Sequence, residues 1–324
     1  MSRAVRIEAV GGPEVLRLVD TDPGRPAAGQ ARVRHRAIGV NYIDTYHRSG
    51  LYPKPLPSGL GVEAAGVVEA LGPDTEGPAV GTRVAYVGGS GASYAEEAVV
   101  PAGTLVELPE SISDEQAAGM MLKGLTAEML LCRIAQIGRG DTILIHAAAG
   151  GVGLIASQWA AHLGATTIGT VGSAEKAELA AAHGCAHTIL YRDEDFVERV
   201  REITGGTGVK AVLDGVGKAV FEGSLDCLQQ RGMMVTFGNA SGQPEPIAPA
   251  LLVAKGSLFL TRPSLFSYIV DPEELRAAGA ALFEVVSSGA VKIEVRHRYP
   301  LAEVRRAHED LEARRTSGSV VLIP

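Results

Sequence analysis

Cysteine is scarce in this chain of 324 residues, and the three that occur, Cys132, Cys185 and Cys227, lie far apart. An odd number of cysteines at such spacing builds neither a disulfide framework nor a Cys-x-x-Cys metal site. We therefore expect the protein to work in a reducing compartment, the cytoplasm.

Positive charge is also in short supply. Lys and Arg number 30 against 37 Asp and Glu, which leaves a formal net charge of −7 at pH 7. No global positive field then draws the protein toward nucleic acid or an anionic membrane surface. A dedicated nucleic-acid-binding role is disfavoured.

The chain has no hydrophobic run suited to a leader or a membrane span. Its first six residues carry charge and pass directly into a strand-like pattern, without the apolar core of a signal peptide. Residues 142–174 contain no Asp, Glu, Lys or Arg, but they include six glycines and divide into strand, turn, helix, turn and strand. We expect no transmembrane segment.

Apolar residues and glycine are abundant instead. The chain is 46% hydrophobic and contains 40 glycines, with no collagen-like or low-complexity period. Its length predicts two domains. So many glycines indicate tight turns and close backbone approaches, and one use of these is contact with a phosphorylated ligand.

The two halves of the chain differ in pattern. Residues 1–118 show short β-like runs separated by Gly and Pro, which predicts a compact, mostly β domain. From there strands and helices alternate, which predicts right-handed βαβ crossovers and a doubly wound parallel sheet in an α/β fold. Strands are expected at 141–146, 166–171, 187–190, 209–214 and 233–237, and helices at 152–163, 174–183, 193–203 and 218–229.

The C-terminal region is expected to return to the first domain. A helix is predicted at 272–288, a strand at 291–295, a helix at 301–314 and a short apolar strand at 319–323 that inserts into an existing sheet. The domains are then 1–118 with 263–324, discontinuous, and 119–262 between them.

A glycine-rich turn follows the strand at 141–146 and opens a helix, which is the context of a dinucleotide fingerprint. Laid on G-x-G-x-x-G, residues 148–153 read Ala-Ala-Gly-Gly-Val-Gly, so Ala148 replaces the first glycine. Gly150 would let the backbone approach a pyrophosphate, and Gly153 would permit close packing of helix on sheet. The helix N-terminus adds N–H groups and a partial positive charge. The alternative is a plain structural turn.

The end of the second strand favours NADPH over NADH. NAD enzymes place a carboxylate there for the ribose 2′-hydroxyl, whereas this chain continues with Gly172 and Ser173. Ser173 can donate a hydrogen bond to a 2′-phosphate and Lys176 can supply a charge. The alternative is that Ser173 only caps a helix, which is compatible with phosphate binding.

Together with the segments Asn41–Gly50, Gly61–Val68 and Val80–Tyr86, this turn makes the sequence similar to the medium-chain dehydrogenase/reductase superfamily. The chain most resembles the zinc-free NADPH:quinone oxidoreductases, the group that includes zeta-crystallin. The resemblance implies a GroES-like catalytic domain, an inserted Rossmann domain and a homodimer joined through the edge strands of the Rossmann domains. We expect that edge at 257–260.

Metal is not expected. Zinc alcohol dehydrogenases of the superfamily carry an early Cys, and a Gly-His-Glu where this chain has Gly61-Val62-Glu63. Val62 cannot ligate zinc, no cysteine precedes Cys132, and no four-Cys structural lobe exists.

The resemblance also implies site residues. It puts Asn41, Asp44 and Tyr46 beside the nicotinamide, with Thr126 at the start of the helix that leads into the Rossmann domain. The alternatives are that Asn41 and Asp44 only hold a turn and that Tyr191 is only an aromatic at a strand end. The further expected cofactor residues are Gly150, Gly151 and Val152 at the pyrophosphate, Gly172, Ser173, Lys176 and Tyr191 at the adenosine phosphate, and Phe237, Gly238, Arg262, Ser264, Leu265 and Ser317; Asn41, Tyr46, Tyr52 and Phe237 are expected at the substrate.

The implied activity is hydride transfer from NADPH to a quinone without a metal, because the cofactor carries the chemistry and the protein supplies proximity. Tyr46 is the candidate proton donor, with solvent or a purely wall-forming Tyr46 as alternatives. No Ser/His/Asp array is recognisable. The rival hypotheses are reduction of the double bond of an enal or enone, and an NADPH-binding structural or RNA-associated protein.

Overall fold

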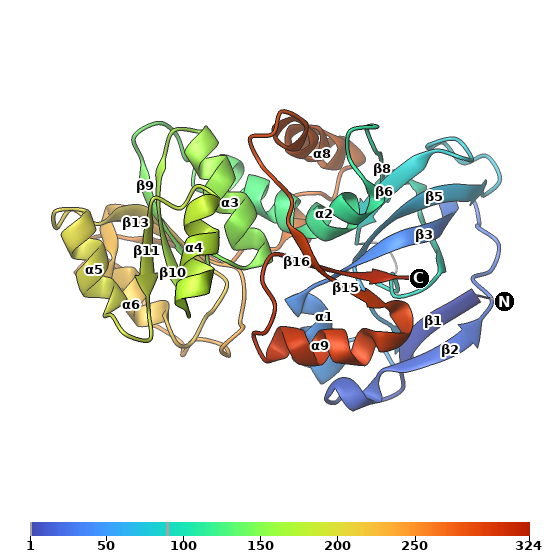
Figure 1. Cartoon of the computed structure of the whole chain (residues 1–324), viewed down its shortest axis with the longest axis horizontal. Coiled ribbons are helices and arrows are strands. Elements are labelled where there is room, and N and C mark those ends of the chain that lie inside the picture. Colours follow the sequence, from blue (N-terminus) through green and yellow to red (C-terminus); the bar gives the residue numbers. More distant parts are fainter. Residues whose placement is uncertain (1, 89–90) are drawn as a thin grey trace. The chain divides into compact units, whose positions relative to one another are not determined.

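The computed structural model describes residues 2–88 and 91–324, and within them the chain forms two compact units (Figure 1). The first unit comprises Met1–Leu125, Ile269–Ser287 and Ile293–Pro324, and the second comprises Thr126–Tyr268 and Ser288–Lys292. The first two changes of unit lie a few residues beyond the boundaries expected after residues 118 and 262, and Ser288–Lys292 return to the second unit within the segment expected to belong to the first.

Six strands of the described chain form the parallel sheet of the second unit, in the order β11-β10-β9-β12-β13-β14. The strands are short and apolar because both faces of a parallel sheet are covered. Three of them have the bounds expected from the sequence. The strands are β9 (Thr142–His146), β10 (Thr166–Val171), β11 (His187–Leu190), β12 (Val209–Asp214), β13 (Leu228–Thr236) and β14 (Phe259–Thr261).

Helices cover both faces of this sheet, as the doubly wound prediction requires. Helices α3 (Gly151–His162) and α4 (Ala174–Ala182) lie on one side of the strands in Figure 1, and α5 (Phe196–Ile203) and α6 (Phe221–Asp226) lie on the other. A short helix, α7 (Ala250–Ala254), precedes the edge strand β14. The strand order reverses between β9 and β12, so the turn after β9 lies at the topological switch point, where open α/β sheets bind ligands.

The first unit is mostly β, as expected. Seven strands within the described residues form one sheet, with the path β15-β16-β3-β5-β6-β8 and β7 paired to β3, and three more form a sheet in the order β2-β1-β4. The strands are β1 (Ser2–Ile7), β2 (Arg17–Thr21), β3 (Gln30–Val40), β4 (Ser58–Gly59), β5 (Glu63–Leu71), β6 (Arg83–Val87), β7 (Glu97–Pro101), β8 (Leu105–Glu107), β15 (Val295–Pro300) and β16 (Ser319–Ile323).

Alternation along β3 shows how this sheet forms. Val33 and Ala37 point into the core and are fully buried, whereas Arg32 and Arg34 point outward. The outward arginines pair with acidic residues of the neighbouring strands, including Arg34 with Glu69 at 2.7 Å. Because side chains of a strand alternate between faces, this register buries the apolar set and keeps the charges in solvent.

Helices complete the first unit. They are α1 (Tyr42–Ser49), α2 (Asp114–Glu128), α8 (Pro272–Ser287) and α9 (Val304–Glu312), with 3-10 turns at Pro13–Val15, Ala102–Thr104 and Leu301–Glu303. The last residues of α2 belong to the second unit, where a π-helical turn (Met129–Ile134) follows and a 3-10 turn lies at Leu265–Ser267.

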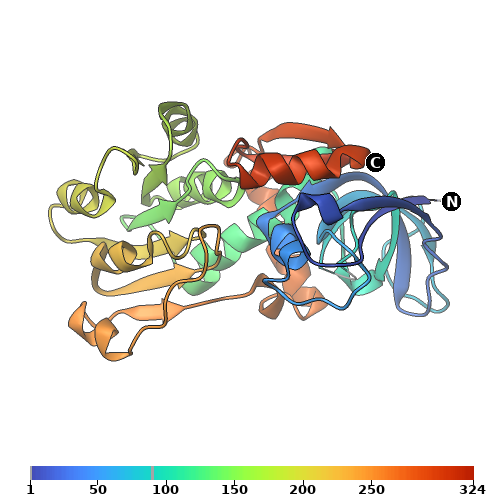
Figure 2. The same cartoon turned by 90° about the horizontal axis from the view of Figure 1, so that it is seen from below.

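The final strand inserts into the sheet of the first unit, as the sequence predicts. Strand β16 pairs with β3 on one side and with β15 on the other. Val321 and Leu322 are fully buried there. Figures 1 and 2 both show this C-terminal segment beside the N-terminal strands.

Some local expectations are wrong, among them the start of the strand expected at 233–237, which begins at Leu228. The strand expected at 291–295 is Val295–Pro300, because its parallel partner β16 begins only at Ser319, opposite Val295. The helix expected at 218–229 is Phe221–Asp226, because Leu228 pairs with Val209 in the sheet.

The expected position of Thr126 is also wrong. This residue lies near the C-terminal end of α2 rather than at a helix start. The helix already begins at Asp114, where the Ser113 hydroxyl accepts the Gln116 N–H at 3.2 Å and the Gln116 side chain accepts the Ser113 N–H at 3.0 Å. This capping box explains the early start.

In the described part of the chain, no helix is both long and apolar enough to cross a membrane.

Gly153 tests how closely α3 packs on the sheet. A Cβ at this position would lie 2.5 Å from the carbonyl oxygen of Ala147 and 2.7 Å from the Ala148 Cα. We expect Gly153→Ala to lower the free energy of unfolding by about 1–3 kcal/mol, since backbone atoms cannot move aside. Urea unfolding measures this. The matched control is Gly138→Ala, whose Cβ would meet no described atom within 4 Å, and an equal loss in both variants would refute the packing argument.

Candidate functional site

The turn after β9 has the geometry of a phosphate cradle. Ala147 adopts φ +55, and the Gly150 N–H donates to the Ala147 carbonyl oxygen at 2.8 Å. Gly150 then serves as the N-cap of α3. The first N–H groups of a helix have no partner within the helix, so those of Gly151 and Val152 are suited to an anion.

Ala148 replaces the first glycine of the fingerprint, and the structure shows what makes this possible. Its methyl group lies over Gly169 of β10, where a Cβ would come within 2.5 Å of the Ala148 Cβ. The glycine missing from the turn is therefore compensated on the neighbouring strand.

The end of β10 has the features expected for an adenosine 2′-phosphate. A Cβ on Gly172 would lie 2.8 Å from the Tyr191 hydroxyl, so the tyrosine closely approaches the backbone at the strand end. Ser173 is the N-cap of α4, and its hydroxyl accepts the Lys176 N–H at 3.4 Å. Ser173 is thus a cap, as the alternative reading held, and its exposed hydroxyl remains compatible with a phosphate. Glu175 is exposed to solvent.

The ends of β12 and β13 approach each other through glycine. A Cβ on Gly238 would lie 2.4 Å from the Gly215 carbonyl oxygen. Phe237 and Gly238 follow β13 directly, and Arg262, just after β14, donates to the Thr236 carbonyl at 2.9 Å. Because the strands are parallel, these residues belong to the same edge of the sheet as the turn after β9. Tyr191, Ser264 and Leu265 also follow strands at this edge.

In the first unit, Asn41 and Asp44 begin α1. The Asp44 carboxylate accepts the Asn41 N–H at 2.8 Å, so both residues do hold the helix start. Both are buried, with exposed fractions of 6% for Asn41 and 0% for Asp44. The Asn41 side-chain amide points elsewhere and donates to Glu63 Oε1 at 2.7 Å.

Glu63 and Lys123 form a buried ion pair beside Asn41. The Lys123 ammonium lies 3.1 Å from Glu63 Oε1, and the Leu122 N–H donates to Glu63 Oε2 at 2.6 Å. Sequence reasoning assigned no role to Lys123. The signal for Lys123 was that it is a single lysine in the segment 117–131, which is mostly buried in α2 and the following turn.

A second buried chain of hydrogen bonds leads away from Asp44. The Tyr94 hydroxyl donates to Asp44 Oδ2 at 2.8 Å and lies 3.1 Å from His308 Nε2. Arg48 Nη1 lies 2.9 Å from His308 Nδ1 and also pairs with Glu312. Burial and the nearby Arg48 lower the pKa of His308 to about 3, so its ring is neutral. No local pattern in the sequence marks Tyr94 or His308.

Tyr46 and Tyr52 form an aromatic pair near the start of this unit. Their ring centroids lie 5.2 Å apart in an edge-on arrangement, and both side chains are half-buried. The structure thus brings together two of the residues expected at the substrate. Ser317 lies just before β16, where its N–H donates to His297 at 3.2 Å.

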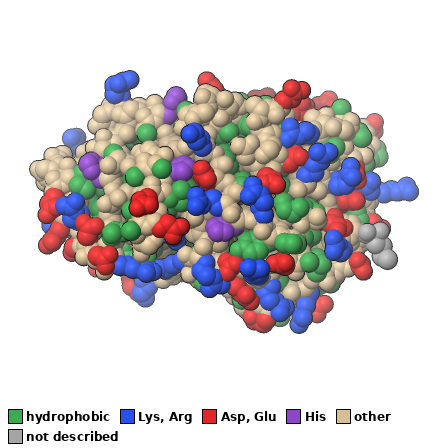
Figure 3. Space-filling model, in the orientation of Figure 1, with side chains coloured by type: hydrophobic (Ala, Val, Ile, Leu, Met, Phe, Trp, Pro, Cys, Tyr) green, Lys and Arg blue, Asp and Glu red, His purple; other side chains and the backbone are tan. Residues whose placement is uncertain are grey.

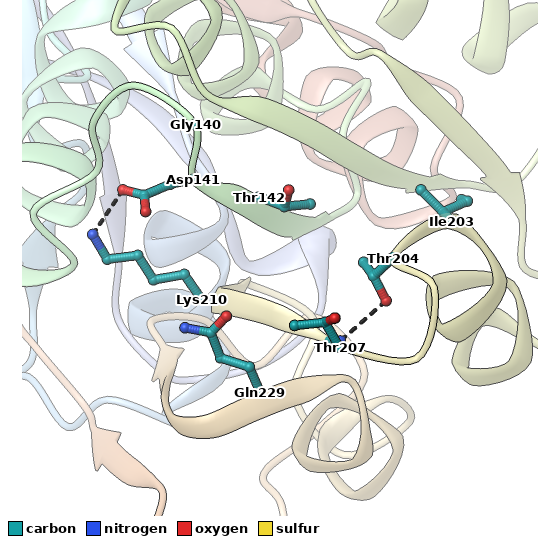
Figure 4. Close-up of a pocket in the computed structure, with 9 residues that line it drawn as sticks. Gly140, Asp141, Thr142, Ile203, Thr204, Thr207, Lys210 and Gln229 are labelled. Atoms are coloured by element: carbon teal, nitrogen blue, oxygen red, sulfur yellow. Dashed lines mark hydrogen bonds and ion pairs between the residues drawn. The ribbon is translucent and has the colours of Figure 1, made fainter.

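A cavity of about 370 Å³ lies at the opposite edge of the second unit's sheet (Figure 4). Its lining includes Asp141 and Lys210, near the amino ends of β9 and β12. These two side chains form an ion pair at 2.7 Å, so the Asp141 carboxylate balances the charge of the lysine. The cavity therefore offers no uncompensated charge to a phosphate, and it is remote from the glycine-rich turn.

Among the described residues, no group of three or more His, Cys, Asp or Glu side chains is arranged to hold a metal ion. Val62 lies buried beside Glu63, and the Glu63 oxygens accept from Asn41, Lys123 and Leu122.

Two family models match the chain. One described as an alcohol dehydrogenase GroES-like domain matches residues 27–110, and one described as a zinc-binding dehydrogenase matches residues 151–282. With the fold above, they define the class: the chain is a member of the medium-chain dehydrogenase/reductase superfamily.

Individual relatives identify the family within this superfamily. The quinone oxidoreductase of Pseudomonas aeruginosa is 51% identical and covers 100% of both chains. The crystal structure of Escherichia coli quinone oxidoreductase complexed with NADPH has a TM-score of 0.98 and 49% identity, over 100% of both chains. The 2-haloacrylate reductase of a Burkholderia species is 45% identical and covers 100% of this chain and 99% of its own. The chain belongs to the quinone oxidoreductase family.

The Glu63–Lys123 pair makes a prediction about stability. Lys123→Met would leave a buried carboxylate without its cation, and we expect this to lower the free energy of unfolding by about 3–5 kcal/mol. Adding Glu63→Gln should restore much of the loss. Urea unfolding measures both. Lys210→Met is the control, because its partly exposed pair with Asp141 should contribute about 1 kcal/mol or less. A double variant as unstable as the single one would contradict the pairing.

Proposed function

We propose that this protein is an NADPH-dependent quinone oxidoreductase that transfers a hydride to a quinone without a metal. The observation that carries the proposal is the similarity over the full length, at about half of all positions, to quinone oxidoreductases, one of which was crystallised with NADPH. The chemistry at the end of β10 supports the same cofactor.

Residues of the second unit would hold the cofactor's phosphates. The N–H groups of Gly151 and Val152 and the bare backbone of Gly150 suit a pyrophosphate. Ser173 and Lys176 suit the 2′-phosphate, since the strand end carries no carboxylate that would repel it. The other residues proposed to contact the cofactor are Thr126, Gly172, Tyr191, Phe237, Gly238, Arg262, Ser264, Leu265 and Ser317.

Residues of the first unit would serve the nicotinamide and the quinone. Asn41, Asp44 and Tyr46 are proposed at the nicotinamide. When bound, NADPH supplies the hydride. Tyr46 and Tyr52 form an edge-on aromatic pair with ring centroids 5.2 Å apart, and the face of either ring offers a surface for a quinone ring to stack on. Tyr46 also remains our candidate for a hydrogen bond to the quinone oxygen.

The proposal needs no zinc. Val62 stands where zinc-dependent relatives carry a histidine ligand, and a branched alkyl group cannot coordinate a metal. Positive charge at this position comes instead from the Lys123 ammonium, held by Glu63.

We also propose a homodimer joined through β14, in the cytoplasm. Strand β14 lies at an edge of its sheet with Phe259 and Leu260 exposed, and Val253 of α7 is exposed close before it in the chain. An apolar sheet edge of this kind favours pairing with a second copy. The cytoplasm is supported by the three cysteines, which are all free in the described structure.

Hydride transfer to quinones tests the proposal directly. NADPH oxidation should be fast with 1,4-benzoquinone and 9,10-phenanthrenequinone, and slow with 2-alkenals or 2-haloacrylate, which test the double-bond reductase alternative. Activity should survive prolonged EDTA treatment. Turnover restricted to alkenes, or loss of turnover together with one bound zinc, would overturn it. A structural or RNA-associated role would give binding of NADPH without turnover. Basic and acidic side chains are interspersed on the face of the protein drawn in Figure 3, so that face presents no continuous basic patch for RNA.

Lys176 tests the cofactor preference. A hydrogen bond to a charged group contributes about 1.5–3 kcal/mol, so Lys176→Ala should raise the KM for NADPH by about 10- to 150-fold. The KM for NADH should change little, because NADH has no 2′-phosphate. Lys218→Ala, which removes an exposed lysine paired with Glu245, is the control. An equal loss for both cofactors would show that Lys176 does not bind the 2′-phosphate.

A further inference from the structure

Asp44 is a buried carboxyl group that forms no ion pair with a residue described in the structure. Its side chain is fully buried, and Oδ1 has no hydrogen-bond partner among the described residues. Only Oδ2 is engaged, by the Asn41 N–H and the Tyr94 hydroxyl. A buried carboxylate in this position is costly, whereas a protonated Oδ1 would remove the charge.

The surrounding charges explain why Asp44 is the acid that takes a proton. The Lys123 ammonium acts on the Asp44 carboxyl group, but it is paired with Glu63, whose two oxygens accept three hydrogen bonds. The Lys123 ammonium is therefore engaged by Glu63 and forms no ion pair with Asp44. Burial first, and then repulsion from Glu63, raise the pKa of Asp44 to about 7, against the lowering effects of Tyr94, Asn41 and Lys123.

The hydrogen bonds that link Arg48, His308, Tyr94 and Asp44 all donate in the same direction, toward Asp44. Arg48 can only donate, so His308 Nδ1 accepts and the ring proton sits on Nε2. That N–H then donates to the Tyr94 oxygen, and the Tyr94 hydroxyl donates to Asp44 Oδ2. Tyr94 is therefore committed as a donor to Oδ2, which leaves Oδ1 as the oxygen that carries the proton. The titratable and charged groups around Asp44 are Arg48, Lys54, Glu63, Tyr94, Lys123 and His308.

We propose that Asp44 is the proton-linked counter-charge of the nicotinamide: a neutral carboxylic acid beside NADPH, and a carboxylate beside the cationic ring of NADP⁺. This inference rests on the proposed function, which places the nicotinamide at Asn41 and Asp44. A neutral ring does not favour ionisation of Asp44, whereas a cationic ring does. Hydride transfer thereby lowers the proton affinity of Asp44.

The step balances. The C–H bond of the dihydronicotinamide breaks, and the hydride with its electron pair reduces the quinone to a hydroquinone monoanion. The O–H bond of Asp44 breaks and its proton is released to water, and the monoanion takes one proton from water to become the hydroquinone. The Asp44 carboxylate regains a proton from water when NADP⁺ leaves.

The test is the pH dependence of a ratio, Kd for NADP⁺ over Kd for NADPH, measured by fluorescence and calorimetric titration from pH 5.5 to 8.5. Both cofactors carry the same 2′-phosphate, so its titration cancels. In wild-type protein the ratio should fall by up to about tenfold per pH unit and level off above about pH 7, since NADP⁺ binding releases one proton. Asp44→Asn should give a flat ratio.

Two variants that leave Asp44 in place should shift the pH at which the ratio levels off, in opposite directions. Tyr94→Phe removes a hydrogen bond that favours the carboxylate, so the levelling point should move to higher pH. Glu63→Gln removes a repelling charge, so that point should move to lower pH. A purely structural role for these residues would weaken both cofactors alike and move neither point. A pH-independent ratio in wild type, or the same slope in Asp44→Asn, would overturn the proposal.

Infrared spectroscopy of the protein without cofactor separates this inference from the proposed function. The carbonyl band of a protonated carboxylic acid should be present at pH 6, disappear as the pH rises through about 7, and be missing in Asp44→Asn. If that band is absent in wild type, Asp44 is ionised and the inference fails even if quinones are reduced. If the band is present but NADPH does not bind, the proposed function is the part that fails, and the counter-charge role falls with it.

Discussion

The buried pair of Glu63 and Lys123 is the interaction on which the polar centre of the first unit depends. Glu63 lies on β5, and its oxygens accept from the start of α1 through Asn41 and from α2 through Lys123 and the Leu122 N–H. Such a pair is tolerated only when its remaining hydrogen-bonding capacity is satisfied. Because the Lys123 ammonium pairs with Glu63, it does not form an ion pair with Asp44.

In the second unit, the comparable constraint is the absence of side chains at the carboxyl edge of the sheet. Gly153 lets α3 lie against the turn after β9, Gly172 admits the Tyr191 hydroxyl, and Gly238 lets its loop meet the Gly215 carbonyl. At each of these positions a Cβ would lie under 3 Å from its neighbour. The edge is therefore shaped by backbone, which is what recognition of a pyrophosphate through N–H groups requires.

The parts of this structure that could be predicted from sequence are those determined by residues close together in the chain. Strands such as Val209–Asp214 are short apolar runs bounded by turn residues, and Gly150 and Ser173 follow such strands directly. The parts that could not be predicted have a distant cause. Strand β15 begins where its partner β16 allows, and Tyr94 contacts Asp44 and His308, which lie 50 or more residues away from it in the sequence. Lys123 is intermediate: its position in an apolar run was visible, but its partner was not.

The absence of a zinc-ligating side chain at Val62 and the raised pKa of Asp44 are linked through charge. A divalent cation is the largest local charge in a site and would hold any neighbouring carboxyl group ionised. With Val62 in this position, the Lys123 ammonium is the positive charge held beside Glu63, and Glu63 balances it. An ionised Asp44 would then be a buried carboxylate without an ion pair of its own among the described residues. Protonation keeps Asp44 neutral until a cation arrives, and the cation that the proposed chemistry generates is the oxidised nicotinamide.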